Sequence, residues 1–387
     1  MHFSEPGRSV AAQTGEQALG GGSHTIAPMP MHALILARGT RTASPTGHQV
    51  QGFLMYERQL RETLGFTFEM RHIDTLDDLR AGLASARAGG FDAVMVMPHW
   101  SDSAEDLKTI FGGFSAHEAR PRLIMLDYYA PTCSPHFGVL PHVDLYIKRQ
   151  TLKDRSLYQR DFAGGFIYSD FVRNTLGFDL GDWHFGSTPD PAHMHKLVSG
   201  WNLGVCFRNR SFLKNTDRIN VPWSLRPIAI NRRVGSINRS GKQEWYQFSR
   251  GKLLEAVEPL ANSHRCTGTD RASAKRYYAE LGLSRLTLSP FGWGEVCFRD
   301  YEAIALGSLL VKPDMSHLET SPDIYVPGET YVPIPWDFSG AAEVCERYLN
   351  DPKESKRIIR NGRAALREYF TKDGFVKDIE RCLRSIE

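Results

Sequence analysis

One stretch decides how this chain folds: residues 289–307, which read SPFGWGEVCFRDYEAIALG. An apolar segment, Leu286 to Leu288, leads into its Pro/Gly loop, and a second apolar segment, Leu309 to Val311, follows it. This order predicts a strand, a glycine loop, a helix and a parallel strand. Such a loop presents backbone N–H groups at the positive end of a helix, where phosphate groups bind. The stretch therefore predicts a phosphate or diphosphate site in an α/β fold.

The same stretch carries the residue types that a nucleotide requires. Glu295, Arg299 and Glu302 are spaced i, i+4, i+7, so they share one face if all three are helical. Gly292 and Gly294 would let a ligand approach the backbone closely. An arginine can neutralise a diphosphate, and a carboxylate can accept hydrogen bonds from a ribose diol. The alternative interpretation is an ordinary surface ion pair beside a turn.

These residues resemble the nucleotide-binding segment of GT-B fold glycosyltransferases, in the group 1 and the exostosin-like or CgeB-like branches, over residues 284–370. The resemblance implies that Glu302 holds the ribose of a nucleotide-sugar, that Arg299 meets its diphosphate, and that Glu295 lies near the donor sugar. This chain departs from the common group 1 pattern in one respect: the two glutamates of that pattern are one residue further apart than Glu295 and Glu302 are here. The implied activity is transfer of a sugar to a glycan, lipid-linked or other hydroxyl acceptor, with surface polysaccharide synthesis as one setting.

The chain has 387 residues, about twice the usual domain size, so two domains are expected. Apolar segments alternate with helical patterns, which predicts parallel sheets covered by helices. The expected strands are His32–Ala37, Phe66–Met70, Ala93–Met97, Leu123–Leu126, Val143–Ile147, Pro227–Asn231, His264–Thr267, Leu286–Leu288 and Leu309–Val311.

We predict a disordered extension over 1–30, a Rossmann-like acceptor domain over 31–200 and a Rossmann-like nucleotide-sugar domain over 201–370. Residues 150–225 have no clear pattern and are expected to join the two halves. The resemblance adds that the domains face a central cleft, and that a helix over 371–387 crosses back to the first domain.

Composition favours a globular protein, with 41% apolar and 24% charged residues. No apolar run approaches the roughly 20 residues that span a bilayer, and the first thirty residues lack a signal-peptide layout. The six cysteines form no C-x-x-C pair, so neither a zinc site nor a redox dithiol is indicated. We therefore expect a cytoplasmic protein with free thiols.

Positive charge is concentrated between Arg208 and Lys242, where nine Lys/Arg residues stand against one acid, Asp217. A solvated basic face, a nucleotide diphosphate, an anionic membrane surface and nucleic acid are the possible explanations. No recognition motif for nucleic acid is present, so we expect none as a partner. A peripheral contact with the inner face of the membrane stays open.

A second phosphate-binding candidate follows the first strand of the second half, at Arg232 and Arg233 before Gly235. Paired arginines at a strand end suit phosphate oxygens, because each guanidinium offers a charged fork. The alternative is a solvent-facing basic turn.

An inverting transfer needs a general base, and the resemblance implies that the first domain supplies it. Asp127 follows the strand Leu123–Leu126, and His99 occupies the equivalent place one strand earlier; Asp102 and Asp170 are further candidates. An Asp after a strand can instead cap a helix or form a turn.

No metal or other cofactor is expected. The chain has no D-x-D triplet, and His193 and His195 have no third ligand in the sequence around them. The absence of a G-x-S-x-G elbow and of a Walker loop argues against hydrolases and phosphate-loop NTPases. Two other functions remain open: a two-lobed protein that binds a small ligand without catalysis, and a nucleotide-sugar epimerase on the same fold.

Overall fold

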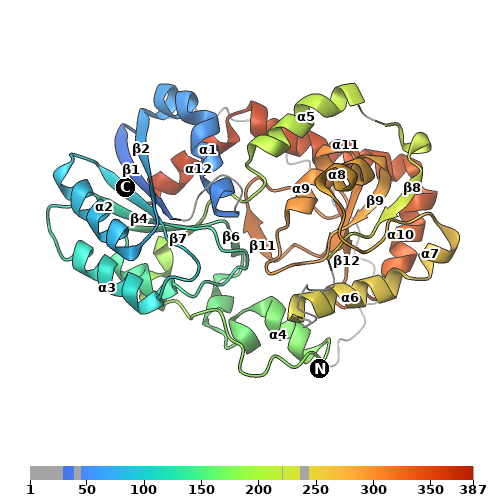
Figure 1. Ribbon diagram of the computed structural model, residues 1–387, viewed down its shortest axis with the longest axis horizontal. Helices are drawn as coiled ribbons and strands as arrows, with labels where there is room; N and C mark the ends of the chain where they lie inside the picture. The colour runs from blue at the N-terminus through green and yellow to red at the C-terminus, as the bar shows by residue number, and fades with distance from the viewer. Residues whose placement is uncertain (1–28, 39–44, 220, 236–243, 387) are drawn as a thin grey trace, which may run out of the picture.

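The computed structural model describes residues 29–38, 45–219, 221–235 and 244–386. Two α/β domains lie side by side, each built on a parallel sheet (Figure 1). The predicted fold class, with two parallel α/β domains, is therefore confirmed.

The first domain contains a six-stranded parallel sheet in the order β2-β1-β3-β4-β5-β7. Its strands are β1 (Met31–Arg38), β2 (Phe66–Ile73), β3 (Ala93–Met97), β4 (Arg122–Asp127), β5 (Leu145–Lys148) and β7 (Leu197–Ser199). The connecting helices are α1 (Pro45–Gln59), which continues as a π-helical turn over Leu60–Leu64, α2 (Leu76–Ala88) and α3 (Ala104–Ser115). Strand β3 is buried along its whole length, as expected for a central strand covered on both faces.

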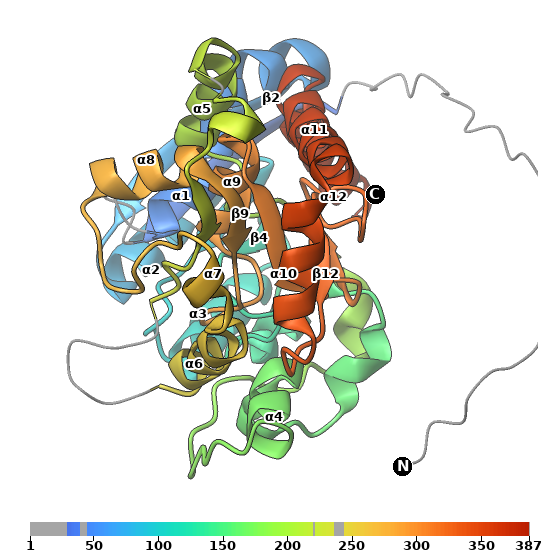
Figure 2. The ribbon, with the colours of Figure 1, turned by 90° about the vertical axis from the view of Figure 1, so that its right-hand side faces the viewer.

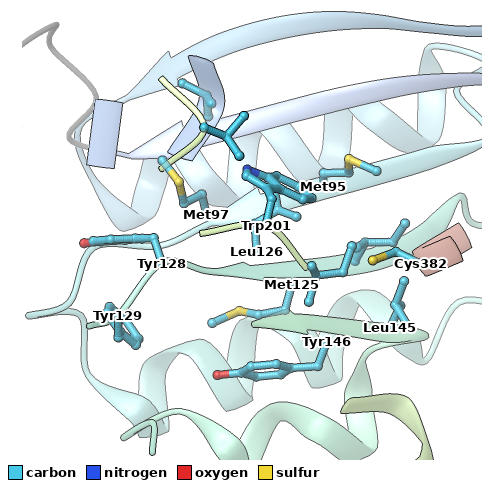
Figure 3. Close-up of a cluster of buried hydrophobic side chains, with 14 of the residues drawn as sticks. Met95, Met97, Met125, Leu126, Tyr128, Tyr129, Leu145, Tyr146, Trp201 and Cys382 are labelled. Atoms are coloured by element: carbon cyan, nitrogen blue, oxygen red, sulfur yellow. The ribbon is translucent and has the colours of Figure 1, made fainter. Parts of the chain in front are cut away.

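The core of this domain depends on a residue from beyond its last strand. Figure 3 shows Trp201 among Met95, Met97 and Leu126, which come from β3 and β4. The Trp201 side chain is fully buried, and its indole nitrogen donates a 2.8 Å hydrogen bond to the carbonyl of Gln49. The segment after β7 is thereby held against α1.

The segment that joins the domains is largely irregular, as predicted. It contains β6 (Gln150–Leu152), α4 (Ile167–Asn174), α5 (Phe207–Ile219) and several short 3-10 turns. Strand β6 pairs antiparallel with β11 (Leu318–Thr320) of the second half, so a small two-stranded sheet ties the domains together (Figure 1).

The second domain contains a four-stranded parallel sheet in the order β12-β10-β9-β8. Its strands are β8 (Ile228–Asn231), β9 (Ser284–Leu288), β10 (Leu309–Pro313) and β12 (Val332–Ile334). Its helices are α6 (Trp245–Val257), α7 (Leu260–Ser263), α8 (Ala274–Leu283), α9 (Phe298–Ala305), α10 (Ala341–Asn350) and α11 (Pro352–Thr371). Figure 2 shows α8 on one side of this sheet and α10 on the other.

Two expectations about chain segments are corrected. Residues His264–Thr267 form no strand, because their pairing with β8 is limited to one bridge between Ile230 and Cys266. Most of the predicted disordered extension, residues 1–28, lies outside the described part of the chain. Met29 is nevertheless buried, and its N–H donates a 2.6 Å hydrogen bond to the Leu64 carbonyl, so it belongs to the first domain.

The last helix, α12 (Gly374–Arg384), returns to the first domain as predicted (Figure 1). The Phe375 ring lies 5.2 Å from that of Phe53 and 4.9 Å from that of Trp201, measured between ring centroids. Arg381 donates a 2.6 Å hydrogen bond to the carbonyl of Ser199. Within the described ranges, no helix has both the length and the apolar character needed to cross a bilayer.

Candidate functional site

A cavity of about 320 Å³ lies between the two domains and contains the motif loop. Ala130 and Arg149 line it from the carboxyl edge of the first sheet, and Leu203 from the connecting segment. The second domain contributes Arg250, Tyr277, Gly292–Gly294, Val296–Arg299 and Glu302. Ligands of open α/β folds bind at this edge of a sheet, so the cavity is the candidate functional site.

Three arginines share this cavity. Arg149 is 2% exposed, and its Nε and Nη2 have no hydrogen-bond partner in the described structure; its Nη1 donates to the Tyr128 carbonyl at 2.5 Å. Burial lowers the pKa of Arg149 to about 10. Arg299 likewise has an unpartnered, buried Nε and Nη1. Buried donors without partners are costly, so a ligand that accepts hydrogen bonds would complete this cluster.

Arg250 is the third member of the arginine cluster. Its Nε donates a 2.9 Å hydrogen bond to the Phe291 carbonyl, and its Nη1 donates to the Gly235 carbonyl at 3.1 Å. Burial and the nearby charge of Arg299 lower its pKa. Arginines held this close together favour an anion between them.

Glu302 is the one acidic side chain that lines the cavity in the described part of the chain. It is 3% exposed and accepts hydrogen bonds from the hydroxyls of Tyr277 at 2.9 Å and Tyr278 at 3.3 Å. Arg208 lies 3.3 Å from its Oε1. A carboxylate has about four acceptor sites, so Glu302 keeps capacity for one more donor.

The position of Arg299 and Glu302 is determined by how helix α9 begins. Asp300 accepts a 2.9 Å hydrogen bond from the N–H of Cys297, which closes the first turn at Phe298. Its carboxylate pairs with Lys312 at 3.2 Å, with both side chains fully buried. Arg299 and Glu302 therefore project from a helix whose start is held by a buried ion pair.

Glu295 does not share a helix face with the other two charged residues, because α9 begins at Phe298 and Glu295 precedes it. It is fully buried, accepts a 3.0 Å hydrogen bond from the Thr132 hydroxyl and has no partner for Oε2 among the described residues. Burial raises its pKa. Glu295 is not among the residues that line the cavity.

The two motif glycines are needed for close contacts within the protein. A Cβ atom at Gly292 would lie 2.6 Å from Nη2 of Arg250. A Cβ atom at Gly294 would collide with the carbonyl of Ala130, in the loop that follows β4. Both glycines line the cavity, and Gly294 also lets the two domains meet.

Arg232 and Arg233, predicted to contact the diphosphate, are paired with carboxylates instead of lining the cavity. Arg232 Nη1 lies 2.6 Å from Glu258. Arg233 pairs with Glu280 and lies 3.0 Å from Asp270, and these partners raise its pKa. Their diphosphate role stays a prediction.

The two candidate bases lie at the carboxyl edge of the first sheet. Asp127 is 1% exposed; it accepts hydrogen bonds from the Tyr146 hydroxyl at 2.7 Å and the Tyr129 N–H at 2.8 Å, and it pairs with Lys148 at 3.2 Å. This is the geometry of a structural ion pair. His99 is half-buried, with Nδ1 2.6 Å from the Ser101 hydroxyl. Neither lines the cavity.

The other acidic candidates have structural partners. Asp102 forms an ion pair with Arg38 and accepts the N–H of His99 at 2.8 Å. Asp170 accepts a 2.9 Å hydrogen bond from the N–H of Ala163. His193 and His195 lie in a 3-10 turn, and the residues that can be described include no group of three or more metal-ligating side chains.

Arg149, Arg250 and Tyr277 are cavity residues that the sequence analysis missed. Arg149 follows β5 directly, so its place after a strand at the carboxyl edge is a signal that could have identified it. Arg250 and Tyr277 lie within helices α6 and α8, where no local pattern distinguishes them from surface residues.

No protein-family model matches the sequence, and no curated protein matches it either. Among solved structures, the chain is similar to sucrose-phosphate synthase from Thermosynechococcus elongatus, at 10% identity over 92% of this chain and 99% of that one, with a TM-score of 0.48. It is similar to a UDP-forming α,α-trehalose-phosphate synthase from Burkholderia vietnamiensis, at 10% identity over 93% and 98%, with a TM-score of 0.47.

A further similar structure is a UDP-GlcNAc 2-epimerase from Neisseria meningitidis bound to UDP-GlcNAc, at 10% identity over 91% of this chain and 99% of that one, with a TM-score of 0.42. Identities and TM-scores this low carry no function over to this chain.

Proposed function

We propose that the protein is a glycosyltransferase of the GT-B type, which binds a nucleotide-sugar in the interdomain cavity and transfers the sugar to a hydroxyl acceptor. The observation that supports this proposal is the arginine cluster. Arg149 from the first domain and Arg299 from the second both have buried N–H groups that find no partner among the described residues, and they share a cavity with Glu302. A diphosphate accepts hydrogen bonds from the arginines, and a ribose hydroxyl donates to the carboxylate.

The chemistry follows from this placement. The sugar leaves with its bond to the diphosphate broken, and the departing oxygen gains negative charge. Guanidinium groups held in place before the reaction stabilise that charge without reorganisation. The acceptor oxygen attacks the anomeric carbon and loses its proton to a base, or to the leaving group if configuration is retained. No step in this scheme requires a metal or another cofactor.

Isothermal calorimetry of the full chain with UDP, GDP, ADP, CMP and their sugars, in buffer containing EDTA, tests the proposal. We expect one of these ligands to bind. At one hundred times its dissociation constant it should also stabilise the fold by about 2.7 kcal/mol. Failure of all of them to bind, with and without added Mg²⁺ or Mn²⁺, would refute the proposal; binding only with the metal would refute metal independence.

Product analysis then separates the functional classes. A glycosyltransferase left with its nucleotide-sugar and no acceptor should slowly release the nucleoside diphosphate and the free sugar, because water replaces the acceptor. A two-lobed binding protein would leave the nucleotide-sugar intact. An epimerase would change the configuration of the sugar, which proton NMR detects directly.

A further inference from the structure

An aromatic group surrounds Trp293, the motif residue between the two glycines. Trp293 lines the cavity and is half-buried. Its ring centroid lies 5.4 Å from that of Phe185 and 5.5 Å from that of Trp183, both in the irregular connecting segment. It lies 6.0 Å from Trp245 and 6.1 Å from Tyr246, both on α6. We call these five residues the aromatic wall; Trp293 is its member that lines the cavity, and the other four, including the buried Trp245, pack around it.

The aromatic wall adjoins the arginine cluster and is separate from the surroundings of Glu302. The guanidinium of Arg250 lies 5.4 Å from the ring centroid of Tyr246, so the wall and the cluster touch. The partners of Glu302 are Tyr277, Tyr278 and Arg208, none of which belongs to the wall. With the ribose at Glu302 and the diphosphate at the arginines, the wall is left for a group beyond the diphosphate.

The wall also reaches the first domain at the edge where an acceptor is expected. The Phe185 ring lies 6.4 Å from that of Tyr129, in the loop that follows β4. The Tyr129 hydroxyl donates a 3.2 Å hydrogen bond to the carbonyl of His99, after β3. The aromatic wall therefore lies between the phosphate-binding arginines and the carboxyl edge of the first sheet.

The composition of the wall suits a sugar ring better than an alkyl chain. Aromatic faces carry partial negative charge and attract the polarised C–H groups on one face of a pyranose, and the indole of Trp293, which lines the cavity, has an N–H that can donate to its hydroxyls. A lipid chain would favour a continuous apolar surface. The large apolar side chains exposed in the described structure are instead spread over five separate segments: Leu54, Trp100, Phe207, Leu225 and Val326.

We propose that Trp293 forms the acceptor subsite: its ring binds the pyranose ring of a carbohydrate acceptor, and the other residues of the aromatic wall hold that ring in place. This inference rests on the proposed function, since it places the acceptor beside the sugar carried by the nucleotide. It assigns the acceptor to the carbohydrates and gives the irregular connecting segment an indirect part, because the rings of Trp183 and Phe185 pack against Trp293 and support it at the cavity.

Saturation-transfer difference NMR tests this assignment with probes that carry a pyranose ring alone or a pyranose ring joined to an alkyl chain. The full chain, saturated with the nucleoside diphosphate found by calorimetry, is mixed with methyl pyranosides of glucose, galactose, mannose and N-acetylglucosamine, and with octyl glucoside below its micellar concentration. We expect transfer to ring protons of at least one pyranoside. Trp293→Leu should weaken that binding about 2- to 10-fold, because an aromatic face contact is lost. Phe185→Leu should act in the same direction but more weakly, because it removes a ring that packs against Trp293 and does not itself line the cavity.

Trp336→Leu is the matched control. Trp336 is also half-buried, but its indole nitrogen donates to the Asp314 carbonyl at 2.8 Å and it does not line the cavity. Circular dichroism and thermal unfolding would establish that each variant is folded. Transfer to octyl protons alone, no transfer to any pyranoside, or equal transfer in folded Trp293→Leu would overturn the assignment. These outcomes leave the nucleotide binding of the wild type unaffected, so they are distinct from a failure of the proposed function.

Discussion

The hydroxyl of Thr132, in the first domain, donates a 3.0 Å hydrogen bond to Oε1 of Glu295, in the second, and both side chains are buried. The contact lies beside Gly294, whose missing side chain makes room for the Ala130 carbonyl. Together they join the loop after β4 to the motif loop at the edge of the cavity. The relative position of the two domains at the site therefore depends on a buried carboxyl group.

Glu295→Gln should stabilise the protein at neutral and mildly alkaline pH. Burial raises the pKa of Glu295 above its ordinary value of 4.5. Its contribution to stability is therefore fully present below about pH 4.5 and is lost as the pH rises through the folded-state pKa. The glutamine keeps an acceptor for Thr132 and carries no charge. Thermal unfolding of both proteins from about pH 4 to pH 8 should show a difference that grows with pH; a constant difference would contradict the prediction.

Arg149→Lys should weaken binding of the nucleoside diphosphate about 10- to 100-fold, because lysine cannot reproduce the charged fork of the guanidinium. Calorimetry measures the change, and Arg232→Lys is the comparison. Arg232 pairs with Glu258 away from the cavity, so its substitution should leave the affinity unchanged. The opposite ranking would support the diphosphate role that the sequence predicts for Arg232.

Glu302→Gln should weaken nucleotide binding in a folded protein, since an amide accepts a ribose hydroxyl less strongly than a carboxylate does. Losing one charged hydrogen bond costs roughly 1.5–3 kcal/mol. Glu343→Gln, an exposed position on α10, serves as the control. If calorimetry gives the wild-type affinity for Glu302→Gln, the carboxylate does not hold the ribose.

Asp127→Asn should destabilise the fold by about 3–5 kcal/mol, because it leaves the fully buried ammonium of Lys148 without its counter-charge. Urea unfolding measures the loss, and a second substitution, Lys148→Met, should recover part of it. The sequence instead predicts that Asp127 is a catalytic base. In that case the Asp127→Asn protein would be as stable as the wild type, and its kcat would be lower by roughly 10²–10⁴. The two measurements together decide between these roles.

Local pattern was sufficient to predict most of the architecture. Buried parallel strands such as Ala93–Met97 are continuous apolar runs, and helices such as α2 show their apolar spacing and carry a capping residue, here Thr75. The strand, loop and helix around Gly292 and Glu302 were predicted because each depends on neighbours in sequence. The sequence left open whether Glu295 belongs to this helix; α9 begins three residues after it, where Asp300, held by Lys312 on the next strand, caps the first turn.

The sequence by itself determined the two α/β halves, the motif and the presence of Arg299 and Glu302 within it. Only the tertiary structure decided which other charges belong to the site. It brings Arg149 and Arg250 next to the motif, although they lie 150 and 49 residues before Arg299 in the sequence. It pairs Arg232 and Asp127 with opposite charges outside the cavity. The residue type alone does not show the role of a guanidinium or a carboxylate group. That role depends on whether the fold places an opposite charge beside the group or leaves the group unpaired at the edge of a cavity.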